Sequence, residues 1–212
     1  KPLFVCEHEG SIYFASELDA LLRAGVVSGK LDAASLDAYF TYLYVPGPET
    51  IYSNVAQLEP GQILVHQNGE SERHTYWRPS YGGDASWTLG RAAAAYKELL
   101  CDAVRMQRVS DVPLGAFLSG GMDSATVVAA MTEFGDVSAD TFTIGFDDPA
   151  ADERAYADAV AKQFGTNHTS AVMDPDLVHL LPELVPHFGQ PFADSSAVPT
   201  YLVSKLAREA VT

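Results

Sequence analysis

The chain is poor in cysteine and in long apolar runs, and both shortages narrow its class. Its 212 residues include two cysteines, Cys6 and Cys101, which lie far apart and lack metal-ligand spacing. We therefore expect two reduced packing thiols in a cytoplasmic protein. No apolar run approaches the roughly 20 residues that cross a bilayer. The opening residues, 1–6, are typical of a strand interior, so neither a membrane segment nor a signal peptide is expected.

Basic residues are also scarce. The chain carries 13 lysines and arginines against 28 acidic residues, which gives a formal net charge of −15. Such a surface repels phosphate backbones and no basic patch compensates for it, so a nucleic-acid partner is not expected. Any polyphosphate ligand must then be held by backbone amides and Mg²⁺ rather than by lysines. The six histidines share no common spacing and predict no metal site.

The first part of the chain is predicted to be β-rich with two helices. The expected elements are strands over 3–6 and 12–15, a helix over 16–24, a helix that begins at Asp32, and strands over 62–67 and 71–77. The turn Asn68-Gly69 predicts a hairpin between the last two strands. A proline and two adjacent glycines then follow, and we expect a domain boundary within a few residues of Gly83.

Beyond Gly83 the pattern changes to alternating helices and strands. The expected elements are helices over 88–108, 123–134, 152–164, 174–187 and 197–210, strands over 114–118, 141–146 and 168–172, and a further strand beginning at 210–212. Short links between strands and helices predict a parallel sheet with right-handed crossovers. The fold class is therefore α/β, with a β-rich domain in front of it.

Apolar spacing also predicts which faces are buried. The strand over 114–118 is continuously apolar, which favours burial on both faces. Helical stripes are expected to face inward; they comprise Leu89, Ala92, Tyr96, Leu99, Ala103 and Val104, then Val127, Val128, Met131 and Phe134, then Tyr156, Ala159, Val160 and Phe164.

The string Ser-Gly-Gly-Met-Asp-Ser over 119–124 directly follows the apolar strand and opens a helix. Ligands of open parallel sheets bind at this edge, where strands lead into helix N-termini. Gly120 and Gly121 allow unusual backbone conformations and leave amides exposed, so the turn can form an anion nest. Ser119 and Ser124 add hydroxyl donors. The turn is therefore predicted to bind phosphate.

Two departures separate this turn from other phosphate loops. It has no lysine after the glycines, as P-loop NTPases do, and it lacks the glycine spacing of dinucleotide folds. Instead Asp123 stands beside the nest, which makes sense for a carboxylate if Mg²⁺ lies between it and a polyphosphate. The alternative is an ordinary tight turn with Asp123 as a helix cap. The complete string after an apolar strand favours the phosphate site.

The string resembles the signature of the ATP-pyrophosphatase family, whose members split ATP between its α and β phosphates to form an adenylate. The resemblance implies that pyrophosphate is bound by Ser119, Gly120, Gly121 and Ser124. It implies a Mg²⁺ ligand at Asp123. It also implies that Leu118, Ile144 and Gly145 contact adenine, an assignment that rests on strand order and not on a distinctive motif.

Flanking segments resemble the glutamine-dependent asparagine synthetase family. Examples are Tyr-Val-Pro-Gly-Pro-Glu-Thr-Ile-Tyr over 44–52 and Phe-Ala-Asp-Ser-Ser-Ala-Val-Pro-Thr over 192–200; others are 1–4, 14–18, 58–61 and 111–115. The resemblance implies the C-terminal part of a glutaminase (class II amidotransferase) domain over 1–80 and the N-terminal part of an ATP-binding synthetase domain over 88–212. It implies ATP and Mg²⁺ as cofactors, aspartate and glutamine as substrates, and it leaves room for a homodimer.

The same resemblance implies that no catalytic nucleophile lies in this chain. The family's N-terminal cysteine would precede Lys1, Cys6 does not match it, and a second pyrophosphate loop would follow Thr212. We therefore expect a piece of a longer enzyme that performs neither half-reaction alone. Alternatives are another adenylate-forming amidotransferase, a ligase resembling β-lactam synthetase, or a non-catalytic nucleotide-binding module.

Several acidic residues keep two interpretations. Asp147 and Asp148 follow a predicted strand and could touch ribose or Mg²⁺, although a solvated loop explains them as well. Asp152 and Glu153 are interpreted as acids at a helix N-terminus. The segment 194–196 could line an aspartate pocket or cap the last helix.

Overall fold

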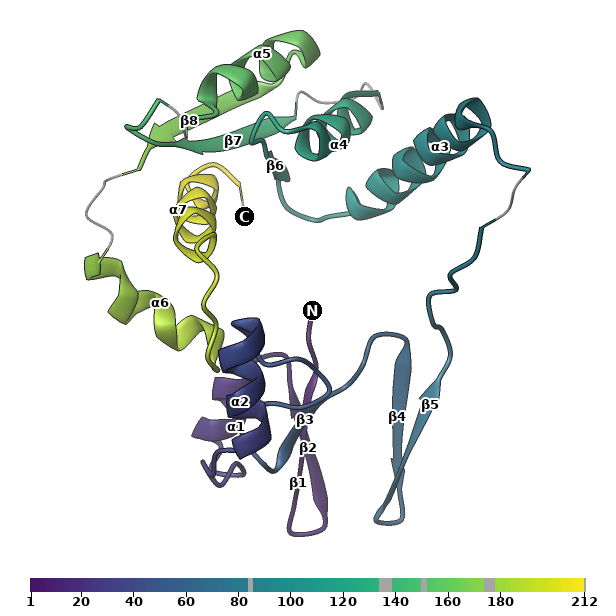
Figure 1. The fold of residues 1–212 in the computed structure, drawn as a ribbon, viewed down its shortest axis with the longest axis vertical. Helices are drawn as coiled ribbons and strands as arrows, with labels where there is room; N and C mark the ends of the chain where they lie inside the picture. Colours follow the sequence, from purple (N-terminus) through teal and green to yellow (C-terminus); the bar gives the residue numbers. More distant parts are fainter. Residues whose placement is uncertain (84–85, 134–138, 150–151, 174–177, 212) are drawn as a thin grey trace. The chain divides into compact units, whose positions relative to one another are not determined.

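The structure is a computed structural model (Figure 1), and it describes residues 1–83, 86–133, 139–149, 152–173 and 178–211. The chain divides into two compact units, which we describe one at a time. Unit 1 comprises Lys1–Gly82 and His179–Ser195, and unit 2 comprises Gly83–Val178 and Ser196–Thr212. The segment His179–Ser195, assigned from the sequence to the second domain, thus groups with the first unit.

Unit 1 is built on a three-stranded antiparallel sheet with the order β2-β1-β3. Its strands are β1 (Phe4–His8), β2 (Ser11–Ala15) and β3 (Val55–Gln57). Glu9 and Gly10 turn the chain between β1 and β2 with φ angles of 49° and 72°, which confirms the first predicted hairpin. The short strand β3, which pairs with β1 from Phe4 to Cys6, was not predicted.

Unit 1 also has two helices, α1 (Leu18–Arg23), which packs against β2, and α2 (Ala33–Tyr42), whose Leu36 and Tyr39 pack against the core. Asp32 begins α2 as predicted, because its Oδ1 accepts a 2.8 Å hydrogen bond from the Ser35 amide. The core of unit 1 joins the sheet, α1 and the loops around them. It comprises Phe4, Cys6, Leu18, Leu21, Val26, Val27, Val45, Ile51 and Val55.

The second predicted hairpin is also confirmed, as β4 (Gln62–Gln67) paired with β5 (Glu70–Thr75). Asn68 and Gly69 form its turn with φ angles of 56° and 82°. Positive φ at both positions is the requirement of the commonest two-residue hairpin turn.

Unit 1 also contains α6 (Leu181–Phe188), which follows the single 3₁₀ turn η1 (Val178–Leu180). The helix predicted over 174–187 is therefore confirmed from Leu181 onward, whereas Val178–Leu180 form a 3₁₀ turn and residues 174–177 lie outside the described residues. Pro182 stands in the first turn of α6, where its fixed φ and missing N–H are tolerated. The helix therefore begins next to this proline.

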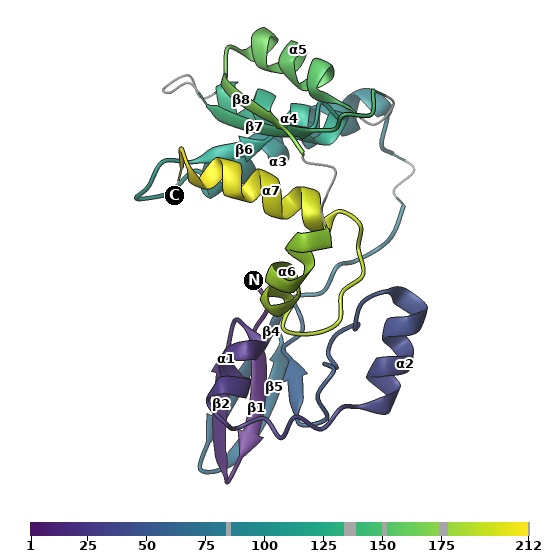
Figure 2. The ribbon, with the colours of Figure 1, turned by 90° about the vertical axis from the view of Figure 1, so that its left-hand side faces the viewer.

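Unit 2 contains a parallel sheet, as predicted, and its strands stand in the order β6-β7-β8. The strands are β6 (Gly115–Phe117), β7 (Asp140–Gly145) and β8 (Asn167–Val172). The helices are α3 (Leu89–Gln107), α4 (Met122–Glu133), α5 (Arg154–Phe164) and α7 (Ala197–Arg208). Figures 1 and 2 show α5 on one face of the sheet and α7 on the other. The α/β class is confirmed by this arrangement.

Burial in unit 2 departs from the predicted pattern. The strand β6 is not buried on both faces: Phe117 is 49% exposed. In the described sheet β6 is an edge strand that pairs with β7 alone, and its side chains are not covered on both faces. Val211 lies in no strand, and Thr212 falls outside the described residues. The strand expected over 210–212 is therefore wrong at the positions that the structure describes.

The helical stripes were partly wrong as well. On α3 the side chains of Leu89, Tyr96 and Leu99 are 88%, 59% and 70% exposed, and only Val104 is buried. Helix α3 packs against α4, but most apolar residues of its stripe are exposed to solvent in this chain.

On α5 the buried positions are Ala157 and Ala161, whereas Tyr156 and Ala159 are exposed. The sheet and α4 approach the face that carries these small alanines. On α4, Val128 is buried as predicted but Val127 is 37% exposed, and Phe134 lies outside the described residues.

Candidate functional site

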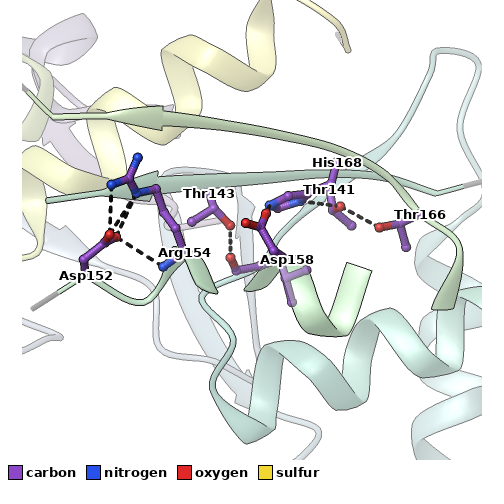
Figure 3. Close-up of polar contacts among 8 residues, drawn as sticks. Thr141, Thr143, Asp152, Arg154, Asp158, Thr166 and His168 are labelled. Atoms are coloured by element: carbon purple, nitrogen blue, oxygen red, sulfur yellow. Dashed lines mark hydrogen bonds and ion pairs between the residues drawn. The ribbon is translucent and has the colours of Figure 1, made fainter. Parts of the chain in front are cut away.

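The turn predicted to bind phosphate begins at Leu118, which is held firmly to the sheet. Its amide donates a 2.9 Å hydrogen bond to the carbonyl of Phe142 in β7. Its carbonyl accepts a hydrogen bond from the Thr143 hydroxyl (Figure 3). The Leu118 side chain is 1% exposed. Leu118 therefore anchors the start of the turn at the carboxyl end of β6.

Inside the turn, two serine hydroxyls gather the backbone amides. The Ser119 amide donates to Ser124 Oγ over 3.3 Å, and the Gly121 amide donates to Ser119 Oγ over 3.3 Å. The two hydroxyl oxygens lie 3.1 Å apart. Ser124 Oγ also donates to the Gly121 carbonyl over 3.2 Å. The structure thus brings together both predicted serines and the amide of one predicted glycine, Gly121, within one turn.

Gly120 is required by both its conformation and its surroundings. Its φ is +77°, in the left-handed region that favours glycine. A Cβ there would lie 2.5 Å from Tyr156 Cβ and 2.7 Å from the Ala157 amide nitrogen. The turn therefore fits against the first turn of α5.

Asp123 is the second residue of α4 and an exposed residue of this turn, Ser119–Ser124, which we call the serine turn. Among the described residues, no group of three or more His, Cys, Asp or Glu side chains could hold a metal ion. Mg²⁺ usually takes one or two carboxylates and completes its shell with water and substrate phosphates. The single exposed carboxylate of Asp123, within the turn predicted to bind phosphate, fits that pattern.

The second strand ends at the same edge of the sheet. Ile144 is partly buried and Gly145 is buried, and the Gly145 carbonyl accepts a 2.8 Å hydrogen bond from the Met173 amide. A Cβ at Gly145 would lie 2.3 Å from Arg154 Cδ and 2.5 Å from Asp152 Oδ1. The side of Gly145 that a side chain would occupy is therefore covered by Arg154 and Asp152.

The cover on Gly145 is an ion pair that sequence reasoning missed. Arg154 Nη2 lies 2.9 Å from Asp152 Oδ2 (Figure 3). The guanidinium holds the pKa of the Asp152 carboxyl below its usual range, and the carboxylate raises the pKa of Arg154. The sequence signal was an acid two residues before an arginine, where the helix begins.

A buried polar cluster at the opposite ends of the strands was missed as well. Thr141 Oγ1 lies 2.8 Å from His168 Nδ1 and 2.9 Å from Thr166 Oγ1. His168 Nε2 faces Asp158 Oδ1 at 3.6 Å (Figure 3). Thr141 and His168 are the second residues of β7 and β8, so this cluster lies away from the edge that carries the serine turn.

The two cysteines differ in their surroundings, and both are free thiols. Cys6 is 1% exposed and donates to the Val26 carbonyl over 3.3 Å, and its burial raises the pKa of the thiol. Cys6 is thus a packing residue, as predicted. Cys101 is only partly buried, and its Sγ lies 3.2 Å from Glu133 Oε2.

In the part of the chain that the structure describes, every helix is too short or too polar to traverse a lipid bilayer.

Each half of the chain matches the model of a known protein family. A family model described as asparagine synthase matches residues 95–212, and one described as glutamine amidotransferase domain matches residues 1–77. The glutamine-hydrolyzing asparagine synthetase 1 of Bacillus subtilis (strain 168) is 33% identical over 214 residues, which cover all of this chain and 33% of that protein.

Two further relatives extend the comparison. A putative glutamine-hydrolyzing asparagine synthetase 2 of Methanocaldococcus jannaschii is 36% identical over the whole chain, which spans 42% of that protein. The amidase chry2 of Gibberella zeae is 26% identical over 194 residues. These residues cover 83% of this chain and 28% of that protein. The chain thus spans between 33% and 42% of the length of the two synthetases. Because the asparagine synthase model matches more than half of the chain, in the order that the sequence motifs predicted, the chain belongs to the asparagine synthase family.

Proposed function

We propose that the protein is a glutamine-dependent asparagine synthetase. In this proposal residues 1–80 belong to a glutaminase domain and residues 88–212 to an ATP-pyrophosphatase-type synthetase domain. The observation that carries the proposal is the serine turn, Ser119–Ser124. It brings backbone amides, two hydroxyls and the carboxylate of Asp123 together after the carboxyl end of a parallel strand. The family match supports the same assignment.

The proposed reaction has two steps. The aspartate β-carboxylate attacks the α-phosphorus of ATP, the bond to the bridging oxygen breaks, and pyrophosphate leaves with its electron pair. Ammonia from glutamine then attacks the acyl carbon, AMP leaves, and one proton is lost to solvent as asparagine forms. A carboxylate is a poor electrophile, so the mixed anhydride with AMP supplies the leaving group that amide formation needs.

Each proposed contact corresponds to a feature of the turn. The amides of Ser119 and Gly121 now point at serine hydroxyls, and phosphate oxygens can accept from the same amides and hydroxyls. To bind the departing pyrophosphate, the two amides exchange the serine oxygens for phosphate oxygens, and the charge on those oxygens strengthens each hydrogen bond. Gly120 and Ser124 complete this surface.

The remaining contacts are proposed for the base and the metal. Adenine would lie against Leu118, Ile144 and Gly145 at the carboxyl ends of β6 and β7, and Arg154 closes one side of Gly145 to it. Asp123 would hold Mg²⁺, which supplies charge neutralisation between phosphate oxygens.

The proposal assigns no catalytic nucleophile to this chain. Cys6 is buried and hydrogen-bonded to the Val26 carbonyl, so it is not placed to attack glutamine. Glutamine hydrolysis by the intact gene product should therefore survive Cys6→Ala. A cytoplasmic location agrees with the two free thiols, and a homodimer remains part of the proposal.

The test is aspartate-dependent exchange of labelled pyrophosphate into ATP by the intact gene product. Exchange should fall by on the order of 100-fold or more in Asp123→Ala, since metal-assisted charge stabilisation is worth several kcal/mol. The matched control is Asp111→Ala, an exposed acid of the same unit that precedes β6. Exchange that ignores aspartate but responds to another carboxylic acid would overturn the asparagine assignment and keep the adenylation chemistry.

The similarity to a protein named amidase favours a second candidate, an adenylate-forming amidotransferase that acts on another acid, such as a ligase resembling β-lactam synthetase. A non-catalytic nucleotide-binding module is less well supported, because Asp123 and Ser124 are both present in the turn. The same exchange assay, run with a panel of carboxylic acids, separates the three.

A further inference from the structure

The Asp152–Arg154 ion pair closes a small ring at the carboxyl end of β7. Arg154 Nε donates to Asp152 Oδ1 over 2.9 Å and to Oδ2 over 3.0 Å, and Nη2 donates to Oδ2 over 2.9 Å. The backbone amide of Arg154 also donates to Oδ1 over 3.2 Å. The backbone amide and the guanidinium of Arg154 therefore both bind the Asp152 carboxylate. These contacts hold the backbone conformation at the start of α5 (Figure 3).

The pair rests directly on the end of the strand. Gly145 leaves the space that the pair fills, since a Cβ there would lie 2.3 Å from Arg154 Nε and Cδ. The side chains of Asp152 and Arg154 are 20% and 32% exposed. This is a partly sheltered, multiply bonded pair, unlike the exposed ion pairs that contribute little elsewhere on protein surfaces.

The first turn of α5 connects the pair to the serine turn. The amides of Tyr156 and Ala157 donate to the Glu153 carbonyl over 3.0 and 3.1 Å, so they belong to that first turn. The same two residues form the surface against which Gly120 fits. A continuous path thus runs from the end of β7, through the pair and the start of α5, to the Gly120 backbone.

We propose that Asp152 and Arg154 are positioning residues for the phosphate-binding turn, acting through the first turn of α5 on the Gly120 backbone. The inference rests on the proposed nucleotide site and adds two residues to it. A donor set for a phosphate must be held within about 0.5 Å of its working geometry by supporting residues. The pair supplies that support from the start of α5, where it rests on the end of β7.

A direct phosphate contact by Arg154 is the competing role, and the geometry argues against it. Its Nε and Nη2 already donate to Asp152, and the pair as a whole carries no net charge. In a chain of net charge −15, an arginine intended for phosphate would gain little from a carboxylate partner that neutralises it. Positioning uses both members equally, whereas a phosphate contact would use Arg154 alone.

The experiment compares Asp152→Ala, Arg154→Ala, Arg154→Lys and the exchanged double variant Asp152→Arg/Arg154→Asp in the intact gene product. The control is Asp102→Ala, which removes an exposed ion pair with Arg105 on α3 in the same unit. The dissociation constant of a non-hydrolysable ATP analogue with Mg²⁺ is measured by calorimetry. KM for ATP and kcat come from pyrophosphate exchange, and melting temperatures report folding.

Both alanine variants are expected to weaken analogue binding by about 10- to 100-fold, because misplacement of a support by about 1 Å has effects of this size. KM for ATP should rise with them, Arg154→Lys should recover part of the loss, and Asp102→Ala should match the wild type. The exchanged variant should bind better than either alanine variant, since it restores a pair at the same place. This last comparison holds even where a single alanine variant is poorly folded.

Three outcomes would overturn the inference: wild-type affinity in both alanine variants, loss confined to Arg154→Ala, or an exchanged variant no better than Arg154→Ala. The second of these would assign Arg154 to direct phosphate contact. The proposed function fails separately, if the wild type binds the analogue but exchanges no pyrophosphate with any carboxylic acid. Weakened binding in both alanine variants would then still support the positioning role.

Discussion

The amide of Ile51 donates a 3.2 Å hydrogen bond to Oε1 of Gln190, a residue 139 positions further along the chain. Ile51 is 2% exposed and belongs to the core of unit 1. The same segment makes two more backbone connections: Ala193 donates to the Leu43 carbonyl over 2.9 Å, and Phe192 forms a bridge with Tyr44. Residues from the second half of the sequence are therefore fastened to unit 1.

The first prediction concerns this fastening. Gln190→Ala leaves the buried Ile51 amide without its acceptor, which should cost about 1–3 kcal/mol. Hydrogen exchange followed by mass spectrometry should show faster exchange at Ile51 and over 189–193. Gln67→Ala, an exposed residue of β4, is the matched control and should leave protection unchanged. Unaltered protection at Ile51 in Gln190→Ala would show that the hydrogen bond is dispensable.

The second prediction separates the two demands on Gly120. Gly120→Ala and Gly165→Ala both place a side chain at positive φ, +77° and +66°, which costs roughly 1–2 kcal/mol. A Cβ at Gly165 meets no described atom within 4 Å, whereas one at Gly120 overlaps Tyr156 and Ala157. Gly120→Ala should therefore lose a further 1–3 kcal/mol or so, together with binding of the ATP analogue. Equal stability of the two variants in urea unfolding would refute the packing argument.

Local chemistry made much of the fold predictable. The turn Asn68-Gly69 has the positive φ angles that its residues favour, and Asp32 caps its helix through its own side chain. Both features depend on neighbours within four residues, so sequence alone specifies them. The helix that begins after Thr88 is another example, since Thr88 Oγ1 accepts from the Arg91 amide.

Burial and pairing were less predictable because they depend on distant residues. The apolar run 114–118 could not reveal that β6 pairs with β7 alone in the described sheet. The string 119–124 predicted the serine turn. The contact of Arg154 with Gly145 could not be predicted in the same way, because it depends on how α5 packs against the end of β7. The Thr141–His168 contact depends on the register of β7 and β8, which no local pattern encodes.

The third prediction tests that buried contact. Thr141 is 0% exposed, and its hydroxyl bonds both His168 Nδ1 and the Thr166 hydroxyl. Thr141→Val keeps the volume but leaves these partners unpaired, so the free energy of unfolding should fall by about 1–3 kcal/mol. Thr169→Val, an exposed position on β8, should stay within about 0.5 kcal/mol of the wild type. Denaturant unfolding decides the matter, and similar losses in both variants would exclude a special role for the cluster.

The fourth prediction concerns the thiol of Cys101 and its two charged neighbours. The hydrogen bond to Glu133, together with desolvation, raises the pKa of Cys101, while Lys97 acts in the opposite direction. Lys97 Nζ lies 2.7 Å from Glu133 Oε1, and this contact lowers the pKa of Glu133, so the carboxylate stays charged as the thiol titrates. The thiolate, which is the species that alkylates, therefore forms at a higher pH than in an unperturbed cysteine.

The two neighbours should have opposite effects on alkylation. Glu133→Gln removes the negative charge, lowers the pKa of Cys101 and speeds its reaction with iodoacetamide at mildly alkaline pH. Lys97→Ala removes the positive charge, raises the pKa further and slows the same reaction. Buried Cys6, 1% exposed, is the internal control and should react only on unfolding. Mass spectrometry across a pH series gives both rates, and a shift of the same sign in the two variants would contradict the electrostatic account.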